Sequence, residues 1–223
     1  MPKFAANLIM RFNEVPFLDC FTAASNAGFK AVEFLFPYAF SISDIQTRLK
    51  DNDLQLVLHN LPAGNWDAGA RDDHRNNLRF AADALKQEGI RLLVEPCSSY
   101  DIPGFALNRS NEGLDVIRAV GSDNLLLQYD IYHMQHMEGE LAATIRKNLP
   151  QIAHIQLAHI QLADNPGRNE PGTGEINYAF LFELLDSIGY QEWIGCEYKP
   201  LKGTEAGLGW LQKIGGVEAT ATA

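Results

Sequence analysis

The chain has 223 residues, and its 46% share of hydrophobic residues is enough for one sizeable core. A net charge of -10 and a pI near 5.0 argue against nucleic acid as the main partner. The three cysteines are widely spaced, the N-terminus does not look like a leader, and no apolar run has membrane length. We therefore expect a reduced cytoplasmic protein without a membrane partner.

Strand-like apolar runs alternate with helical patterns from end to end. The expected strands cover 4–9, 31–36, 55–59, 91–95, 125–130, 152–162 and 193–197. Several are continuously apolar, as strands buried on both faces are. The alternation predicts a parallel sheet, and this much repetition favours a (β/α) barrel over a doubly wound sheet. We expect one barrel domain over 1–214 and a frayed tail over 215–223.

Polar residues mark the expected ends of several helices. Ser43 and Gln46 have the spacing of a capping box for the second helix. Ser110 and Asn177 are expected to cap two later helices. The spacing of apolar residues predicts a long helix over 72–88.

Two irregularities interrupt the pattern. Only seven strands are expected where a complete barrel has eight, and the chain passes directly from a loop near Gly69 into the long helix at Asp72. We expect the barrel to be incomplete, and open or distorted between its third and fourth strands. The pentapeptide AHIQL at 153–157 is repeated at once at 158–162. We expect these extra residues to lengthen the strand or to form a bulge at its N-terminal end.

Three expected strands end on an acidic residue, namely Glu95, Asp130 and Glu197. A (β/α) barrel builds its active site at the C-terminal ends of its strands. Carboxylates that converge there repel one another unless a cation offsets their charge. The pattern therefore predicts a metal site with oxygen ligands.

Several longer segments carry a family resemblance. They are FAANL at 4–8, AVEFLFPY at 31–38, HNLPAGNW at 59–66, QYDIYHMQ at 128–135, EPGTGEINY at 170–178 and GCEYKP at 195–200. With these segments the chain resembles the hydroxypyruvate isomerase family, within the xylose isomerase-like TIM barrels. The resemblance covers residues 1 to 210. The chain lacks one internal βα segment that the family carries ahead of the helix at Asp72.

The resemblance implies a divalent metal held by Glu95, Asp130, Gln161 and Glu197. Gln156 in the first copy of the repeat is the alternative to Gln161. We favour Gln161 because the loop that follows the second copy continues the family's motif. Oxygen ligands of this kind suit Mg²⁺ or Mn²⁺ better than Zn²⁺.

The resemblance also implies an activity, the interconversion of hydroxypyruvate and tartronate semialdehyde through an enediolate. Glu95 and Glu197 are expected to carry the proton, one as base and the other as acid. His133 is expected to bind a substrate oxygen.

Arg168 is expected to bind the substrate carboxylate. Lys199 and His59 are further candidates for contact with the substrate, a small hydroxy-keto acid. For His59, a packed strand-end residue is an equal alternative.

Two other activities of the same scaffold remain open, those of a 2-oxo-tetronate isomerase and of a ketose 3-epimerase. An inactive barrel remnant is a further alternative, because a segment is missing and another is duplicated. An endonuclease-type barrel is disfavoured by the acidic charge and by the lack of a histidine ligand set. Open strand edges would also permit a homo-oligomer.

Overall fold

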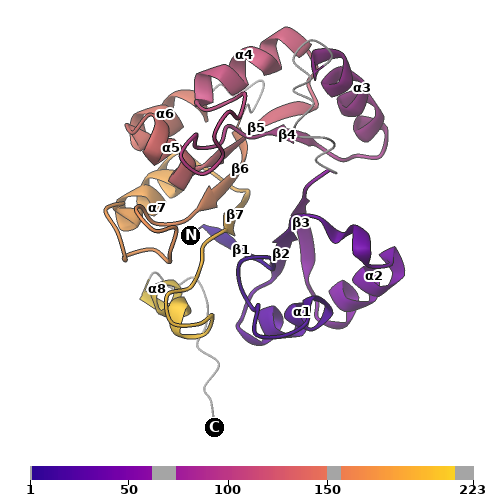
Figure 1. Cartoon of the computed structure of the whole chain (residues 1–223), viewed down its shortest axis with the longest axis vertical. Helices are drawn as coiled ribbons and strands as arrows, with labels where there is room; N and C mark the ends of the chain where they lie inside the picture. The colour runs from indigo at the N-terminus through magenta and orange to yellow at the C-terminus, as the bar shows by residue number, and fades with distance from the viewer. Residues whose placement is uncertain (1, 62–73, 150–156, 214–223) are drawn as a thin grey trace. The chain divides into compact units, whose positions relative to one another are not determined.

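The computed structural model of the chain describes residues 2–61, 74–149 and 157–213. The chain divides into two compact units, a first of residues 1–63 with 162–223 and a second of residues 64–161. Each unit combines parallel strands with helices packed beside them (Figure 1). The predicted tail at 215–223, the start of the long helix and the alternative ligand Gln156 all lie outside the described residues.

The first unit contains both ends of the barrel pattern. Its elements are β1 (Lys3–Asn7), α1 (Phe17–Asn26), β2 (Ala31–Phe34), η1 (Pro37–Ala39), α2 (Ile42–Asp51), β3 (Gln55–His59), α7 (Tyr178–Ser187), β7 (Trp193–Cys196), η3 (Ala206–Leu208) and α8 (Gly209–Lys213). The strand order is β3-β2-β1-β7, and the pairs within it are parallel.

The second unit contains the middle of the pattern. Its elements are α3 (His74–Gln87), β4 (Leu92–Val94), α4 (Ser110–Val120), β5 (Leu125–Asp130), α5 (Ile131–Met137), α6 (Leu141–Asn148) and β6 (Leu157–Leu162), the last of which reaches the unit boundary. Its strand order is β6-β5-β4, again with parallel pairs.

These elements confirm the predicted fold class. The described residues hold seven strands, each at the predicted place, against the eight of a complete (β/α) barrel. β3 ends the strand order of the first unit and β4 ends that of the second, so the third and fourth strands are both edge strands, as expected for an incomplete barrel.

A β-bulge accommodates part of the duplicated pentapeptide. Leu127 pairs with Leu157, but the next residue, Gln128, pairs with His159, so that one residue of β6 is left over. The bulge lies in the N-terminal half of β6, as predicted. Beyond it the second copy of the repeat runs to the strand end, where Gln161 pairs with Asp130.

Burial on both faces explains the apolar strands. In β1 only the first residue is exposed, and in β5 all residues but one are buried. In the first unit the ring of Phe4 on β1 packs edge-on against Phe182 of α7 and Trp210 of α8, with centroids 5.3 Å apart in both pairs. Burying an aromatic side chain of this size contributes roughly 1.5–3 kcal/mol, so such contacts hold the helices on the sheet.

The helix caps confirm one prediction and correct two. Asn177 caps α7 by accepting a hydrogen bond from Phe180 N. The cap of α2 is Ser41, whose hydroxyl accepts from Asp44 N, rather than the predicted Ser43. Serines at both positions lie close to the first apolar residue, and the spacing rule alone selected the wrong one.

α4 also begins differently from the prediction, because Ser110 is its first residue and not its cap. The exposed N–H groups ahead of the helix are satisfied by Glu112, whose carboxylate accepts from the backbone of Asn108 at 2.7 Å and of Arg109 at 3.0 Å.

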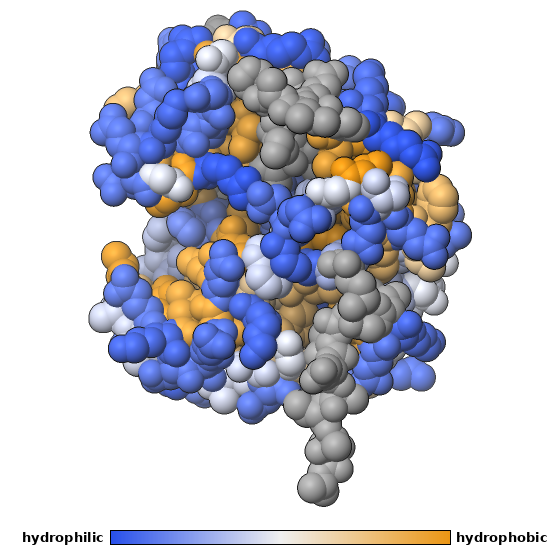
Figure 2. Space-filling model, turned by 180° about the vertical axis from the view of Figure 1, so that it is seen from behind, coloured by the Kyte–Doolittle hydropathy of each residue, from blue (hydrophilic) through white to orange (hydrophobic). Residues whose placement is uncertain are grey.

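The face of the molecule shown in Figure 2 is mostly hydrophilic, with hydrophobic residues in smaller groups between. This agrees with a chain that carries 28 acidic and 18 basic residues. Among the described residues, no helix has both the length and the apolar character that crossing a membrane requires.

Candidate active site

Glu197 is the centre of a buried polar group in the first unit. It follows β7 directly, and only 5% of its surface is exposed. Arg168 Nη2 donates to Glu197 Oε2 at 2.5 Å, and Asn7 Nδ2 donates to Glu197 Oε1 at 3.3 Å. The same amide donates to Glu33 Oε1 at 2.9 Å. Asn7 thus links two carboxylates, and Arg168 supplies a positive charge beside one of them.

The position of Arg168 is set by a loop that is organised around Asp164. The Asp164 carboxylate is fully buried and accepts five backbone hydrogen bonds. Arg168 has a φ of 56°, its N–H donates to Asp164 O at 3.0 Å, and its carbonyl accepts from Lys199 N at 2.8 Å. The five donors to the carboxylate are Asn165, Gly172, Thr173, Gly174 and Ile176.

Gly195, two residues before Glu197, has to be a glycine for steric reasons. A Cβ built on Gly195 of β7 would overlap the carboxylate of Glu33, which is fully buried on β2. Only a residue without a side chain lets that carboxylate lie across β7 and reach Asn7.

Two predicted substrate contacts have more exposed side chains. Lys199 lies two residues after Glu197 and borders an open hollow of about 520 Å³. His59 ends β3, and its Nδ1 lies 3.3 Å from Asn60 O. Substrate contact by either residue stays a prediction.

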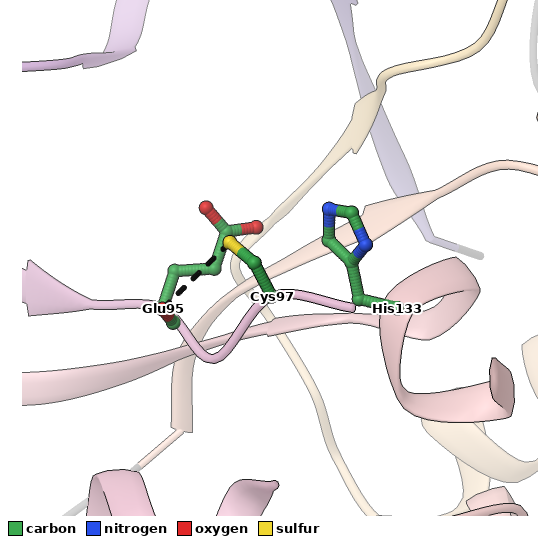
Figure 3. A group of neighbouring side chains, drawn as sticks. All are labelled: Glu95, Cys97 and His133. Atoms are coloured by element: carbon green, nitrogen blue, oxygen red, sulfur yellow. Dashed lines mark hydrogen bonds between the residues drawn. The ribbon is translucent and has the colours of Figure 1, made fainter. Parts of the chain in front are cut away.

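In the second unit, three side chains of different chemistry point toward one another (Figure 3). Glu95 follows β4 directly, Cys97 lies two residues further, and His133 belongs to the first turn of α5. An oxygen, a sulfur and a nitrogen of these residues all lie within 4.8 Å of one another. Cys97 and His133 are buried, and Glu95 is half-buried.

Asp130 borders this group and also caps α5. Its Oδ1 accepts from Tyr132 N at 2.7 Å and from His133 N at 3.3 Å, while its Oδ2 lies 3.7 Å from His133 Nε2. One carboxylate thus fixes the start of the helix and faces the imidazole. Gln161 lies level with Asp130 on β6, and its Oε1 accepts from Gln128 Nε2 at 2.6 Å.

The structure therefore brings predicted residues together within each unit. Glu95, Asp130 and His133 gather in the second unit, and Glu197 and Arg168 pair in the first.

Sequence reasoning missed three contributors to these groups. Asn7 ends β1, and a polar residue at a strand end is the same signal that pointed to Glu95, Asp130 and Glu197. It was missed because only charged residues were considered. Cys97 lies in a loop, where strand alternation gives no direction. Asp164 precedes a loop rich in glycine and proline, whose many N–H groups require an acceptor.

The donor set fits a divalent cation. The second unit places the half-buried carboxylate of Glu95 and the buried carboxylate of Asp130 beside a thiol and an imidazole. Carboxylate, thiol and imidazole are all metal ligands, and together they form a possible metal-binding group.

The fold and these strand-end groups define a protein class. Residues 67–214 match the family described as xylose isomerase-like TIM barrel, and the chain belongs to that family. It is 41% identical to a hydroxypyruvate isomerase of Escherichia coli K12, over 95% of this chain and 98% of the relative. It is 39% identical to a 2-oxo-tetronate isomerase of Cupriavidus necator H16, with the same two coverages. These relatives confirm the predicted enzyme class, an isomerase.

Solved structures agree with the fold. The crystal structure of an AP endonuclease, family 2, from Brucella melitensis superposes with a TM-score of 0.89 and 36% identity, covering 96% of this chain and 99% of that one.

The alignment with the Cupriavidus protein spans 260 positions, more than this chain's 223 residues. That relative therefore carries internal residues that this chain lacks, as the resemblance implied.

Proposed function

We propose that the protein is a metal-assisted aldose–ketose isomerase that interconverts hydroxypyruvate and tartronate semialdehyde. The observation that carries the proposal is the likeness, over nearly the full length, to isomerases named for hydroxypyruvate and 2-oxo-tetronate. The acidic residues just past β4 and β7, Glu95 and Glu197, give that likeness a chemical basis.

Each glutamate has a role in moving the proton. One of Glu95 and Glu197 removes a proton from C3 of hydroxypyruvate and leaves an enediolate, and the other delivers a proton to C2. The hydroxyl proton passes from the C3 oxygen to the C2 oxygen, so that a ketone becomes an aldehyde and atoms balance. The roles reverse in the opposite direction.

Glu95, Asp130, Gln161 and Glu197 are the proposed metal ligands, with Mg²⁺ or Mn²⁺ as the ion. When bound, the ion would stabilise the negative charge that develops on the substrate oxygens. The Gln128 amide supports this assignment for Gln161, because it fixes the orientation of that ligand's carbonyl oxygen.

Two residues are proposed to orient the substrate. The guanidinium of Arg168 suits the substrate carboxylate. When bound, that carboxylate would either share the guanidinium with Glu197 or displace Glu197 from it. His133 is proposed to donate to a substrate oxygen, and Asp101 Oδ2, 3.5 Å from its Nδ1, supports a fixed ring orientation.

The observations weigh differently on two alternatives. 2-Oxo-tetronate remains a candidate substrate, because the two relatives are almost equally similar to the chain. The name of the Brucella relative would suggest action on nucleic acid, but a net charge of -10 opposes binding to a phosphate backbone.

The test is an isomerisation assay with hydroxypyruvate and with 2-oxo-tetronate, each with added Mg²⁺ or Mn²⁺, beside a thermal melt. Turnover of hydroxypyruvate by a protein that melts cooperatively is the expected result. Faster turnover of 2-oxo-tetronate would make that four-carbon acid the proposed substrate in place of hydroxypyruvate. A broad melt without turnover on either acid would favour an inactive remnant and overturn the proposal.

A further inference from the structure

Cys97 takes part in a buried group whose chemistry differs from that of an all-oxygen site. Figure 3 shows its thiol beside the Glu95 carboxylate, with the His133 ring close by. Cys97 is 7% exposed and His133 is 3% exposed. Sulfur, nitrogen and oxygen donors thus meet within 4.8 Å, largely shielded from water.

We propose that Cys97 is a metal ligand, and that Glu95, Cys97 and His133 together bind a thiophilic divalent ion such as Zn²⁺ or Co²⁺ in preference to Mg²⁺. Mg²⁺ takes oxygen ligands in near-octahedral geometry, whereas Zn²⁺ accepts thiolate, imidazole and carboxylate in one tetrahedral site. The proposal rests on the proposed function and revises its metal site: Glu95 would hold Zn²⁺ or Co²⁺ in place of Mg²⁺ or Mn²⁺, and His133 would bind the ion in place of a substrate oxygen. Its test does not require turnover.

The distances suit such an ion. In a tetrahedral site, ligand atoms that each lie about 2.0–2.3 Å from the ion are about 3.3–3.8 Å apart. The observed atoms lie within 4.8 Å of one another, so the side chains would have to approach by about 1 Å. The ion would also offset the charges of the Glu95 carboxylate and of the thiolate that forms when Cys97 loses its proton.

The surroundings of His133 favour a metal-binding orientation. Asp101 Oδ2 lies 3.5 Å from His133 Nδ1, and a carboxylate on one ring nitrogen leaves the other nitrogen available as a ligand. Asp130 Oδ2 lies 3.7 Å from that other nitrogen, Nε2, so a fourth donor borders the group. Three protein ligands with a carboxylate beside them match the composition of zinc sites.

The backbone holds the thiol in this place. Cys97 N–H donates to Leu107 O at 2.9 Å, and Cys97 O accepts from Asn108 Nδ2 at 2.8 Å. Its Sγ lies 3.9 Å from the carbonyl oxygen of Glu95, the contact drawn as a dashed line in Figure 3. The loop after β4 thus fixes Cys97 from both sides, and little rearrangement is needed for it to bind an ion.

The experiment is a titration of the whole protein with Co²⁺, followed by absorption spectroscopy. A thiolate ligand is expected to give a sulfur-to-cobalt charge-transfer band in the near ultraviolet, which added Zn²⁺ removes. Cys97→Ser is expected to abolish the band and to weaken Co²⁺ binding at least about tenfold.

The matched control is Cys20→Ser in the first unit. Cys20 is buried, its Sγ donates to Phe12 O at 3.3 Å, and burial raises the pKa of its thiol to about 11. A serine hydroxyl can donate to the same carbonyl, so band and affinity are expected to stay unchanged.

Two results would overturn the proposal: bound Co²⁺ without a charge-transfer band in the unmodified protein, or a band that survives in Cys97→Ser. If Cys97→Ser does not fold, X-ray absorption of the Zn²⁺-loaded natural protein decides by the presence or absence of sulfur at about 2.3 Å. Failure of the isomerase assay with the band intact would sink the proposed function and leave this inference standing.

Discussion

Glu197 and Glu95 hold the same position relative to their strands, one residue past the end, yet their neighbours differ. The contacts described for Glu197 come from hydrogen-bond donors, the guanidinium of Arg168 and the amide of Asn7. Glu95 instead has the donor atoms of Cys97 and His133 close by. The first arrangement fixes the orientation of a carboxylate, and the second assembles ligands for a cation.

An acidic residue at a strand end indicates where a functional site lies, but not what the site binds. Its place on a (β/α) barrel locates a site, because the C-terminal strand ends carry the functional groups. Its chemistry depends on the loops beside it. The carboxylate of Asp164 organises the loop that places the Arg168 guanidinium beside Glu197. The turn after β4 places the Cys97 thiol beside Glu95.

The strongest test of the two regions is removal of either carboxylate's charge. Glu95→Gln and Glu197→Gln are each expected to lower isomerisation by at least about 10²-fold, because the amide keeps an oxygen donor but cannot accept the proton. The measurement is turnover of hydroxypyruvate under saturating substrate. Glu183→Gln, an exposed residue of α7, serves as the control. Near-native turnover in either variant would remove that residue from the proton transfer.

The framework around Glu197 is tested by Asp164→Asn. An amide nitrogen would face backbone N–H groups that now donate to a carboxylate oxygen, and we expect a loss of about 2 kcal/mol in the free energy of unfolding. Urea unfolding measures it. Asp115→Asn, which breaks an exposed pair with Arg118, is expected to cost less than about 0.5 kcal/mol. Equal losses in both variants would contradict a special role for Asp164.

Close packing behind the Glu95 group is tested by Gly113→Ala in α4. A Cβ there would lie 2.7 Å from Leu127 Cδ1 and 3.2 Å from Pro96 Cγ. Overpacking of about 1–3 kcal/mol is expected to exceed the helix-propensity gain of about 1 kcal/mol, so that the melting temperature falls. At Gly209 a Cβ meets no atom within 4 Å, so Gly209→Ala is the control and is expected not to destabilise. A stabilised Gly113→Ala would refute this packing.

The sequence allowed much of the fold to be predicted. Buried parallel strands are apolar on both faces, so their runs stand out, and the predicted strands 55–59 and 125–130 match β3 and β5. β1, β2, β4 and β7 end one or two residues before the predicted spans do. Helix starts were less certain, because Ser41 and Ser43 offer the same capping chemistry two residues apart.

The candidate site was predictable only in part. Glu95, Asp130 and Glu197 were found because a charge at the end of an apolar run is conspicuous. The direction of Cys97 depends on hydrogen bonds from its loop to Leu107 and Asn108, about ten residues away, and short-range patterns do not contain such contacts.

The smallest effect is expected at Glu14, in the first unit. Hydrogen bonds from Thr204, whose N–H donates at 3.0 Å and whose hydroxyl donates at 3.1 Å, lower the pKa of the Glu14 carboxyl. A carboxyl whose pKa is lower in the folded chain adds stability above its unfolded pKa, near 4.5, and loses it as the pH falls through the folded value. Because Glu14 is exposed, we expect Glu14→Gln to cost less than about 1 kcal/mol at pH 7. Urea midpoints of both proteins, measured between pH 7 and pH 3, should converge toward acid, and a constant or growing gap would contradict this role of Glu14.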